Sequence, residues 1–508
     1  MFQATIDAFG NLLDPTHFLW LILGVAIGWW VGIIPGIGSL VGVAVILPFL
    51  YGMDPVSGLF LLIGIFAVNN TSDTFPAVIF GIPGGASSAA TIMDGHPLAK
   101  KGQAGRALGA AFTASMIGGI VGALVLVAVL PLVRPLVLSL GSPELLALTV
   151  LGLLTVGIIA RGVVLLGVVS ACVGLALATI GTAPAVIEER FTFGTEFLQD
   201  GLSVVIVAVG LFGVPELLHL LVYKTSIAQK SATDNAVGYR QLRQGARDTF
   251  RNTPLVVGSG ALASFLAIIP GVGGSVITWI VWSLTGFSKK NKVPLGQGEI
   301  RGVIGPESAN NATDGGQLVP TLFFGVPGSG GMAILLAGMT LMGVGAGPRM
   351  LEDSGLVLVL SIVIGLCAAN ILGTLICFGI ARWVSRLTDV PGRVIVPFLM
   401  VTLTLACFQG EEALGFLFIM LALGVLGWIM LIFGVPRVPV LVGFVLGDPV
   451  ERYLWISVDR YGASWLWTPK VLVIFGCMVA MVVGAIYLAR LANRTHAPAE
   501  PSAAVRWR

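Results

Sequence analysis

A short polar block occurs twice in the chain, each time inside otherwise apolar sequence. The block has the form Asn-Asn-x-x-Asp, and its two copies end at Asp73 and Asp314. On a helix the Asp lies three and four positions from the two Asn, so all three side chains share one face. A carboxylate within an apolar segment is energetically costly and by default marks a path for an ion or a substrate.

These two blocks supply the predicted ion-coupling residues. Their amide, hydroxyl and carboxylate oxygens are hard donors that suit sodium. Asp73 as a protonatable group is a variant of the same idea, and caps or turns built from Asn and Asp are the structural alternative. The coupling ion is predicted to be sodium or a proton, with sodium bound only transiently and no resident metal or other cofactor. The predicted residues are Asn69, Asn70, Thr71, Asp73, Asn310, Asn311, Thr313 and Asp314.

A second repeated segment, rich in Gly, Pro and Ser, covers residues 81–88 and again 325–331. Pro and small polar residues favour the first turn of a helix, and Gly leaves backbone N–H groups exposed. Two such helix starts near the middle of a membrane would attract an anion. Gly for close helix packing is the alternative. The substrate-binding residues predicted here are Pro83, Gly84, Gly85, Ser87, Pro327, Gly328, Ser329 and Gly330.

A third repeated block, Pro-Gly-x-Gly, interrupts two long apolar runs, residues 17–50 and 255–284. Each run is too long for one comfortable membrane crossing and too short for two crossings joined by a loop. A helix broken at the Pro-Gly, or a re-entrant hairpin, fits both lengths, and a simple kink is the alternative. Matching breaks in two halves point to a binding site. The block adds Pro35, Gly36, Gly38, Pro270, Gly271 and Gly273 to the predicted substrate site.

Membrane helices must position these blocks. Of the 508 residues, 56% are hydrophobic and only 10% are charged, against roughly 25% in an ordinary soluble protein. Roughly ten to twelve hydrophobic segments are found on the criterion of about 20 apolar residues per crossing, several of them short or broken. The predicted fold is an all-α, polytopic membrane protein with broken or re-entrant helices. The net charge of +3 gives no reason to expect a nucleic-acid partner.

The three blocks recur in the same order, which predicts two related halves. Corresponding loops of the halves differ in their basic residues, so the positive-inside rule places them on opposite sides of the membrane. This pattern indicates an inverted-topology repeat. The arginines near the C-terminus look cytoplasmic, whereas a strictly inverted second half would place them outside; an extra crossing between Arg437 and Lys470 would resolve this conflict. The predicted boundaries are 1–222 for the first repeat, 223–253 for a basic cytoplasmic linker, 254–492 for the second repeat and 493–508 for a polar tail.

No pattern typical of an enzyme is found in the sequence. It has no phosphate loop of the form Gly-x-x-x-x-Gly-Lys-Ser/Thr and no His-Glu-x-x-His zinc motif. The five Cys residues occur singly in apolar stretches, as small buried residues do. Asp94, Lys100, Lys101 and Arg106 are expected in a solvated loop, and Glu307 is expected either to gate the site or to face water.

The repeated blocks resemble those of a known family. The paired Ile-Pro-Gly-x-Gly, Asn-Asn-x-x-Asp and Gly-x-Pro-Gly segments are similar to those of the large membrane subunit of the tripartite tricarboxylate transporters, the TctA family. The resemblance extends from about Trp20 to about Leu491. It implies a bacterial inner-membrane protein that works with a small membrane subunit and a periplasmic solute-binding protein. It also implies uptake of citrate-like tricarboxylates, or other di- or monocarboxylates, driven by an ion gradient.

Residues and resemblance together predict secondary active uptake by alternating access, with the repeated blocks of both halves forming one central site. Two rivals stay open. A carboxylate or anion channel of the same architecture would lack saturable, gradient-coupled uptake. An intramembrane enzyme acting on lipid-linked substrates would need a nucleophile–base pair, for which the sequence offers no convincing candidate.

Overall fold

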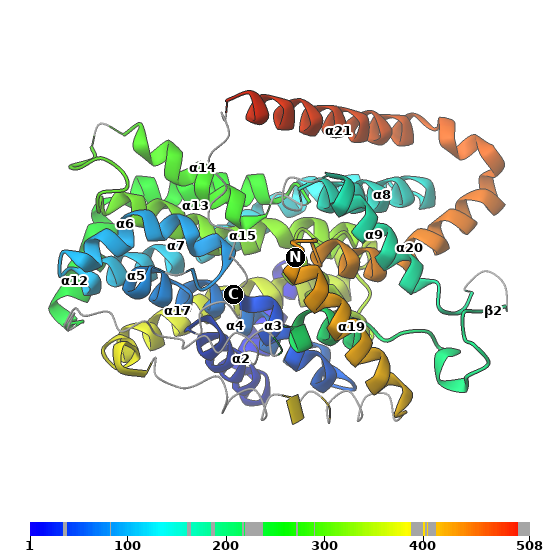
Figure 1. Cartoon of the computed structure of the whole chain (residues 1–508), viewed down its shortest axis with the longest axis horizontal. Coiled ribbons are helices and arrows are strands. Elements are labelled where there is room, and N and C mark those ends of the chain that lie inside the picture. The colour runs from blue at the N-terminus through cyan, green and yellow to red at the C-terminus, as the bar shows by residue number, and fades with distance from the viewer. Residues whose placement is uncertain are drawn as a thin grey trace, which may run out of the picture.

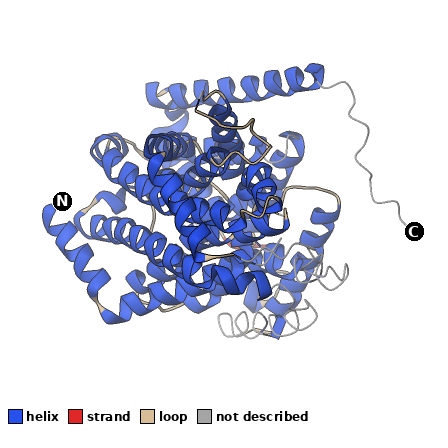
Figure 2. Ribbon diagram, turned by 90° about the vertical axis from the view of Figure 1, so that its left-hand side faces the viewer, coloured by secondary structure: helices blue, strands red, loops and turns tan. Residues whose placement is uncertain are grey.

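Helices dominate the protein, which is described by a computed structural model (Figures 1 and 2). The structure describes residues 1–33, 38–81, 83–159, 164–183, 188–215, 218, 237–270, 273–288, 290–387, 400–401, 404 and 413–495. Within these ranges the only strands are β1 (Gly181–Thr182) and β2 (Glu189–Arg190), which pair antiparallel. The predicted all-α class is confirmed.

The two halves present equivalent helices in the same order. The first half contains α1 (Phe2–Leu13), α2 (Pro15–Ile33), α3 (Gly38–Ile46), η1 (Leu47–Leu50), α4 (Pro55–Ser72), α5 (Thr74–Phe80), η2 (Ala86–Ser88), α6 (Ala89–Lys100), α7 (Ala104–Leu138), α8 (Ser142–Ile159), α9 (Val164–Ala178), η3 (Glu196–Leu198), α10 (Val204–Ala208) and η4 (Val209–Gly213). The linker and second half contain α12 (Tyr239–Arg251), α13 (Thr253–Ala267), α14 (Gly274–Gly286), α15 (Arg301–Phe324), α16 (Gly330–Leu341), η5 (Pro348–Leu351), α17 (Asp353–Leu387), α19 (Gly415–Ile432), α20 (Val438–Tyr461), η6 (Gly462–Trp467) and α21 (Pro469–Thr495). The series α2, α3, α4–α5, α6 and α7 thus corresponds to α13, α14, α15, α16 and α17.

Several helices are long and apolar enough to cross a membrane. They are Pro15–Ile33, Pro55–Phe80, Ala104–Val137, Asp353–Val384 and Gly415–Ile432 among the described residues. A pair bent by 68°, Val438–Trp467 with Pro469–Ala480, passes the same test as one unit, and shorter apolar helices accompany them. The chain is therefore a polytopic membrane protein. Helix α20 occupies the stretch between Arg437 and Lys470, where an extra crossing would explain a cytoplasmic location of the arginines near the C-terminus.

Both Pro-Gly-x-Gly blocks coincide with helix breaks. Helices α2 and α3 end and begin on either side of residues 34–37, and α13 and α14 on either side of residues 268–273. The predicted interruptions are therefore confirmed. Three predicted site residues, Pro35, Gly36 and Gly271, lie outside the described residues.

The Gly-x-Pro-Gly segments begin with the same turn in both halves. Helix α5 ends at Gly81 and α15 ends at Gly325, and both glycines are left-handed, with φ of 69° and 66°. The N–H of each glycine donates to the carbonyl of the proline five residues earlier, Pro76 or Pro320. Gly adopts this conformation without strain, so it ends each helix and redirects the chain.

Helices α2 and α4 of the first half run side by side in the same direction. Gly24 of α2 meets the backbone of Leu61 of α4, and Gly32, two turns later, meets that of Asn69. A Cβ on either glycine would overlap these atoms, so the missing side chains permit the close approach.

Helices α13 and α15 of the second half pack in the same way. The hydroxyl of Ser308 donates to the Val256 carbonyl (2.7 Å), and that of Ser264 to the Ala312 carbonyl (2.8 Å). The later residue of α13, Ser264, contacts the later residue of α15, Ala312, so the two helices run in the same direction. The equivalent pairs α2–α4 and α13–α15 therefore share one geometry.

The long helices α7 and α17, which hold equivalent places in the two halves, run in opposite directions. Thr374 of α17 donates to the Phe112 carbonyl of α7 (3.2 Å), while Asn370, one turn earlier on α17, lies against Gly119, two turns later on α7. The start of α7 and the end of α17 both contact α12.

Helix α15 is the buried centre of the molecule, with α4, α7, α13 and α14 packed against it (Figure 1). Every residue from Gly302 to Phe323 is buried, although this stretch includes Glu307 and Asp314 as well as amides and hydroxyls. A helix this polar is stable in a membrane only where protein, and not lipid, surrounds it. The apolar helices therefore surround α15 and separate it from lipid.

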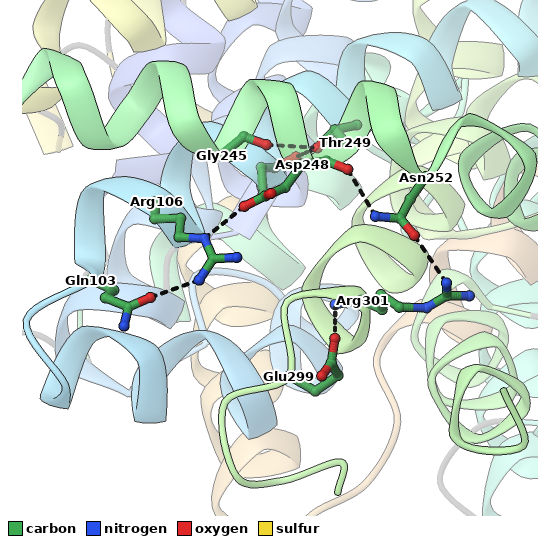
Figure 3. Close-up of polar contacts among 9 residues, drawn as sticks. Gln103, Arg106, Gly245, Asp248, Thr249, Asn252, Glu299 and Arg301 are labelled. Carbon is green, nitrogen blue, oxygen red and sulfur yellow. Dashed lines mark hydrogen bonds and ion pairs between the residues drawn. The ribbon is translucent and has the colours of Figure 1, made fainter. Parts of the chain in front are cut away.

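The linker helix α12 joins both halves at one end of the molecule (Figure 3). Arg106 of α7 forms an ion pair with Asp248 of α12 (Nε–Oδ2 2.6 Å), and Arg301 of α15 donates to Asn252 at the end of α12 (2.9 Å). Of the predicted linker, residues 237–253 are described.

Replacement of Gly325 by Ala tests the left-handed turn. A Cβ there has no heavy atom within 4 Å, so backbone strain of about 1–2 kcal/mol is the expected effect. We expect a lower apparent melting temperature of the purified protein in detergent, followed by light scattering on heating. The control is Gly379→Ala, because this helical glycine also has open space around it. Equal melting temperatures for the two variants would contradict the assigned turn.

Candidate ion and substrate site

Asp73 lies at the joint between α4 and α5 and is 1% exposed. Neither of its carboxylate oxygens has a hydrogen-bond partner among the described residues. The Ser88 hydroxyl donates to the carbonyl of Gly85 (2.9 Å) and lies close enough to Asp73 to act on its carboxylate. The ionised carboxylate thus lacks compensation from the surrounding protein, so it needs a cation or a proton.

Two glycines of the first Gly-x-Pro-Gly segment lie directly against Asp73. A Cβ on Gly84 would lie 2.7 Å from the Asp73 Cβ, and a Cβ on Gly85 would lie 2.9 Å from Asp73 Oδ2. Side chains at these positions would displace the carboxylate, so glycine is needed for the close backbone approach. The structure therefore brings together the substrate segment and the ion block that the sequence predicts in the first half.

Asp314, the equivalent residue of the second half, is bound by the first half. The amide Nδ2 of Asn70 donates to both carboxylate oxygens of Asp314 (3.1 Å each). In return, the amide of Asn310 donates to the backbone carbonyl of Asn70 (3.0 Å), across 240 residues of sequence. The two predicted ion blocks are thus in direct contact.

Asn311 is fully buried and joins three helices. Its Nδ2 lies within hydrogen-bond distance of the Ala67 carbonyl (3.1 Å), the Thr71 hydroxyl (2.8 Å) and Asn370 Oδ1 (2.8 Å). Thr71 and Asn311 therefore hold α4, α15 and α17 together. The Oδ1 atoms of Asn69 and Asn311 are buried with no donor in the described part of the chain, which leaves two further oxygens for a cation.

Glu307 is fully buried, so the expectation that it could face water is wrong. Its carboxylate accepts hydrogen bonds from three hydroxyl groups of the first half, those of Thr74 (2.8 Å), Thr91 (2.5 Å) and Ser115 (2.9 Å). Helices α5, α6 and α7 supply these hydroxyls, so one carboxylate of the second half joins three elements of the first. No sequence spacing marks the three residues, because separate helices carry them.

The second Gly-rich segment caps α16. Ser329 accepts a backbone N–H of the first turn (3.3 Å) and donates to Gln317 Oε1 of α15 (2.8 Å), and α16 then begins at Gly330. Gly328 lies against the side chain of Gln317. The predicted helix start is confirmed, but an amide occupies the place that Asp73 has in the first half. The two sites are therefore chemically different.

The start of α14 lies beside the first-half segment. A Cβ on Gly274 would have Thr313 Oγ1 at 3.4 Å and Ser87 Cβ at 3.7 Å, so all three kinds of block meet here. The Thr313 hydroxyl itself donates to the Asn310 carbonyl (2.6 Å). Among the other predicted residues, Pro83 is exposed, Pro270 and Gly273 are partly exposed, Pro327 is buried and Gly38 begins α3.

Three buried carboxylates share this region, because Glu307 accepts from Thr74, directly after Asp73, and Asp314 accepts from Asn70, three residues before it. Within the described ranges, none of the three forms an ion pair with a basic side chain. In the same ranges, no three His, Cys, Asp or Glu side chains converge closely enough to hold one metal ion.

Asp94 is a second charged residue whose surroundings the sequence misplaces. It is fully buried, where a solvated loop was expected. Its Oδ1 accepts the backbone N–H groups of Gly296 (2.9 Å), Gly298 (3.0 Å) and Glu299 (2.9 Å), and its Oδ2 accepts Trp282 Nε1 (2.9 Å). These bonds tie α6 of the first half to the loop that precedes α15.

Membrane helices that enclose a polar, carboxylate-containing site between two related sets of elements are typical of a solute transporter. The chain belongs to the tripartite tricarboxylate transporter TctA family, whose sequence profile matches residues 18–442. The family assignment made from the repeated blocks is therefore confirmed.

Two similar proteins come from Agrobacterium vitis. The "Uncharacterized 52.8 kDa protein in TAR-I ttuC' 3'region" is 33% identical over 450 residues, which cover 88% of each chain. The "Uncharacterized protein in TAR-II ttuC' 3'region" is 30% identical over 192 residues, which cover 38% of this chain and 78% of the relative. No solved structure matches the chain.

Replacement of Gly84 by Ala tests the contact with Asp73. Overpacking of about 1–3 kcal/mol is expected to weaken cation binding roughly tenfold or more. The measurement is the rise in melting temperature of the purified protein in sodium chloride relative to choline chloride. The control is Gly273→Ala, whose Cβ would meet only Ser275 Oγ, at 3.7 Å. A sodium-dependent rise that Gly84→Ala leaves unchanged would contradict a cation site at Asp73.

Proposed function

We propose that the protein is the large transmembrane subunit of a binding-protein-dependent tripartite transporter that takes up a carboxylate by cation-coupled secondary transport. The observation that carries this proposal is the Asp73 carboxylate, which is buried, has no partner among the described residues and touches the glycine backbone of the substrate segment. Family membership supports the tripartite assignment.

The coupling of substrate uptake to a cation gradient follows from the negative charges of the carboxylates at the site. An anionic substrate is repelled by Asp73, Glu307 and Asp314 as long as these carboxylates are ionised and unpaired. Cations or protons on the carboxylates remove this repulsion, so substrate and cation bind together more readily than either does alone. Each cation that enters with the substrate then links uptake to the ion gradient.

Sodium is the favoured coupling ion, and a proton is the alternative. Asp73 Oδ1 and Oδ2 and the Oδ1 atoms of Asn69 and Asn311 are buried oxygens without donors in the described part of the chain. Amide oxygens bind a metal cation but take up no proton near neutral pH, so their presence favours sodium.

The substrate is proposed to be a tricarboxylate such as citrate, or a related di- or monocarboxylate. The start of α6 follows Gly84 and Gly85, and the start of α16 follows Ser329, so backbone N–H groups of two helix starts are available to carboxylate oxygens. Lys and Arg are absent from both glycine-rich segments, which leaves the backbone as the anion-binding group.

Transport is proposed to occur by alternating access between inverted repeats. The pairs α2–α4 and α13–α15 are equivalent and parallel, whereas the equivalent helices α7 and α17 are antiparallel, and both facts support inversion. The hydrogen bonds of Asn70, Asp314 and Glu307 cross between the halves and would be exchanged as the halves move.

The proposed partners are a small membrane subunit and a periplasmic solute-binding protein, with the chain in the bacterial inner membrane. Family membership supports both parts of this proposal. The binding protein would deliver the carboxylate to the site from the periplasm.

Uptake by proteoliposomes that contain the chain, its small subunit and its binding protein tests the proposal. Labelled citrate is offered first in a panel of carboxylates, with and without an inward sodium gradient. We expect saturable uptake that needs both the binding protein and the gradient. Asp73→Asn and Asp314→Asn should each reduce coupled uptake at least tenfold, because a neutral amide no longer requires the cation.

The control variant is Asp448→Asn, since Asp448 pairs with Arg452 on the exposed surface of α20 and contributes about 1 kcal/mol at most. Wild-type uptake by the Asp73 and Asp314 variants would refute the site. Uptake that follows a pH gradient and ignores sodium would assign the coupling to protons. Non-saturable flux that ignores both gradients would indicate a channel.

A further inference from the structure

A loop with two exposed phenylalanines lies at the end of the molecule opposite to α12. Phe191 and Phe193 follow directly on β2 and are 61% and 84% exposed. Figure 1 places β2 at one extreme of the long axis and α12 at the other. Residues 188–201, which include both rings, are called the phenylalanine loop below.

The backbone of the phenylalanine loop is strained. Phe191 has a φ of 56° and Phe193 a φ of 51°, and in the described part of the chain no other residue except glycine has a positive φ. Bulky side chains rarely adopt this conformation, and such strain gathers at binding and switch sites where the surroundings enforce it. Two strained residues that both hold a large apolar ring away from the rest of the protein are not explained by folding alone.

The base of the loop is held firmly by the rest of the protein. Arg190 makes two parallel hydrogen bonds to Glu451 of α20 (3.0 Å each), which is a rigid bidentate pair. The ring of Phe197 packs edge-on against Phe416 of α19, with 5.2 Å between centroids. These two anchors fix the loop to α19 and α20 and hold its tip in place.

The tip itself is ordered so that both rings face outward. Thr192, between the two phenylalanines, is buried, and its hydroxyl donates to Glu189 (3.1 Å). The hydroxyl and N–H of Thr195 both donate to the Thr192 carbonyl, at 2.7 and 2.9 Å. Because Thr192 points inward, its two neighbours point outward as a preformed aromatic pair.

The charges on the loop indicate what covers the rings. Three further carboxylates of the loop, those of Glu188, Glu196 and Asp200, are exposed. Aromatic residues at the centre with polar residues at the rim are the usual anatomy of a protein–protein interface. Carboxylates are repelled by the anionic surface of a bilayer, so this rim disfavours insertion of the rings among lipid headgroups.

The position of the loop indicates the side on which its partner lies. At the opposite end, α12 carries exposed arginines at the i, i+3 and i+4 spacings of one helix face: Arg240, Arg243, Arg247 and Arg251. Basic residues concentrate on the cytoplasmic side of membrane proteins. The phenylalanine loop therefore lies at the external end, where a periplasmic partner approaches.

We propose that the phenylalanine loop is the docking surface for the solute-binding protein, which receives Phe191 and Phe193 in an apolar pocket bordered by basic residues. This inference rests on the proposed function, because it requires a binding-protein-dependent transporter. The rigid base and preformed tip reduce the ordering that docking would otherwise require.

The test is uptake of substrate as a function of binding-protein concentration in proteoliposomes with all three components. The variant Phe191→Asn with Phe193→Asn removes both rings but retains a residue type that tolerates a left-handed backbone. We expect its half-saturating concentration of binding protein to rise at least about tenfold, with uptake at saturation unchanged. The matched control is Phe250→Asn, which removes a 60% exposed ring from α12 at the other end.

The outcomes separate the two proposals. Wild-type uptake that needs no binding protein refutes the proposed function, whatever the loop does. Uptake that needs the binding protein, with equal half-saturation in the wild type and the double variant, refutes the docking surface alone.

A fluorescence measurement identifies the occupant of the surface. The emission of Phe193→Trp is read as the difference from that of the wild-type protein, both reconstituted in vesicles with brominated lipids. Emission that shifts to the blue only when the binding protein is added supports docking. Quenching by the brominated lipids without any partner would show that the rings contact the bilayer and would overturn the inference. A shift caused by the small membrane subunit alone would overturn it as well.

Discussion

A carboxylate buried in a membrane protein without a counter-charge is the constraint on which the rest of this structure depends. Asp73 has 1% of its surface exposed and no hydrogen-bond partner among the described residues, and Glu307 and Asp314 add negative charge nearby. Burial of an ionised group is stable only with compensation. In the function proposed here, the missing compensation is supplied by the ion that the transporter moves. The strength of coupling then follows from how unfavourable the site is when it lacks cations.

The burial of α15 among apolar helices follows from the same constraint. A helix with Glu307, Asp314 and several amides is incompatible with lipid, so apolar helices surround it and glycines such as Gly24 and Gly32 allow neighbouring helices to pack closely. Carboxylates of the second half accept hydrogen bonds from the first half. Asn70 donates to Asp314, and hydroxyls of α5, α6 and α7 donate to Glu307. Movement of one half against the other would therefore change the hydrogen bonds of Glu307 and Asp314 together.

The two ends of the molecule are chemically different. Helix α12 presents arginines and ties both halves together through Arg106 and Asn252, which suits a cytoplasmic end that holds the halves at a shared pivot (Figure 3). The opposite end presents rigid aromatic and acidic groups on the phenylalanine loop. The polar site lies between them, which agrees with the proposal that substrate enters from the end with the phenylalanine loop.

Composition and the repeated blocks by themselves determined the membrane class, the helix breaks and the family, and they named the residues proposed here to bind ions and substrate. These features are local, since hydrophobic runs, Pro-Gly breaks and left-handed glycines act within a few residues of sequence. Only the tertiary structure decided that Asp94 is buried and hydrogen-bonded to a distant loop, and that Thr74, Thr91 and Ser115 donate hydrogen bonds to Glu307. It also decided that Phe191 and Phe193 are exposed on a strained loop. A buried polar group takes its partner from whichever helix is adjacent in space, and no spacing along the chain records that neighbour.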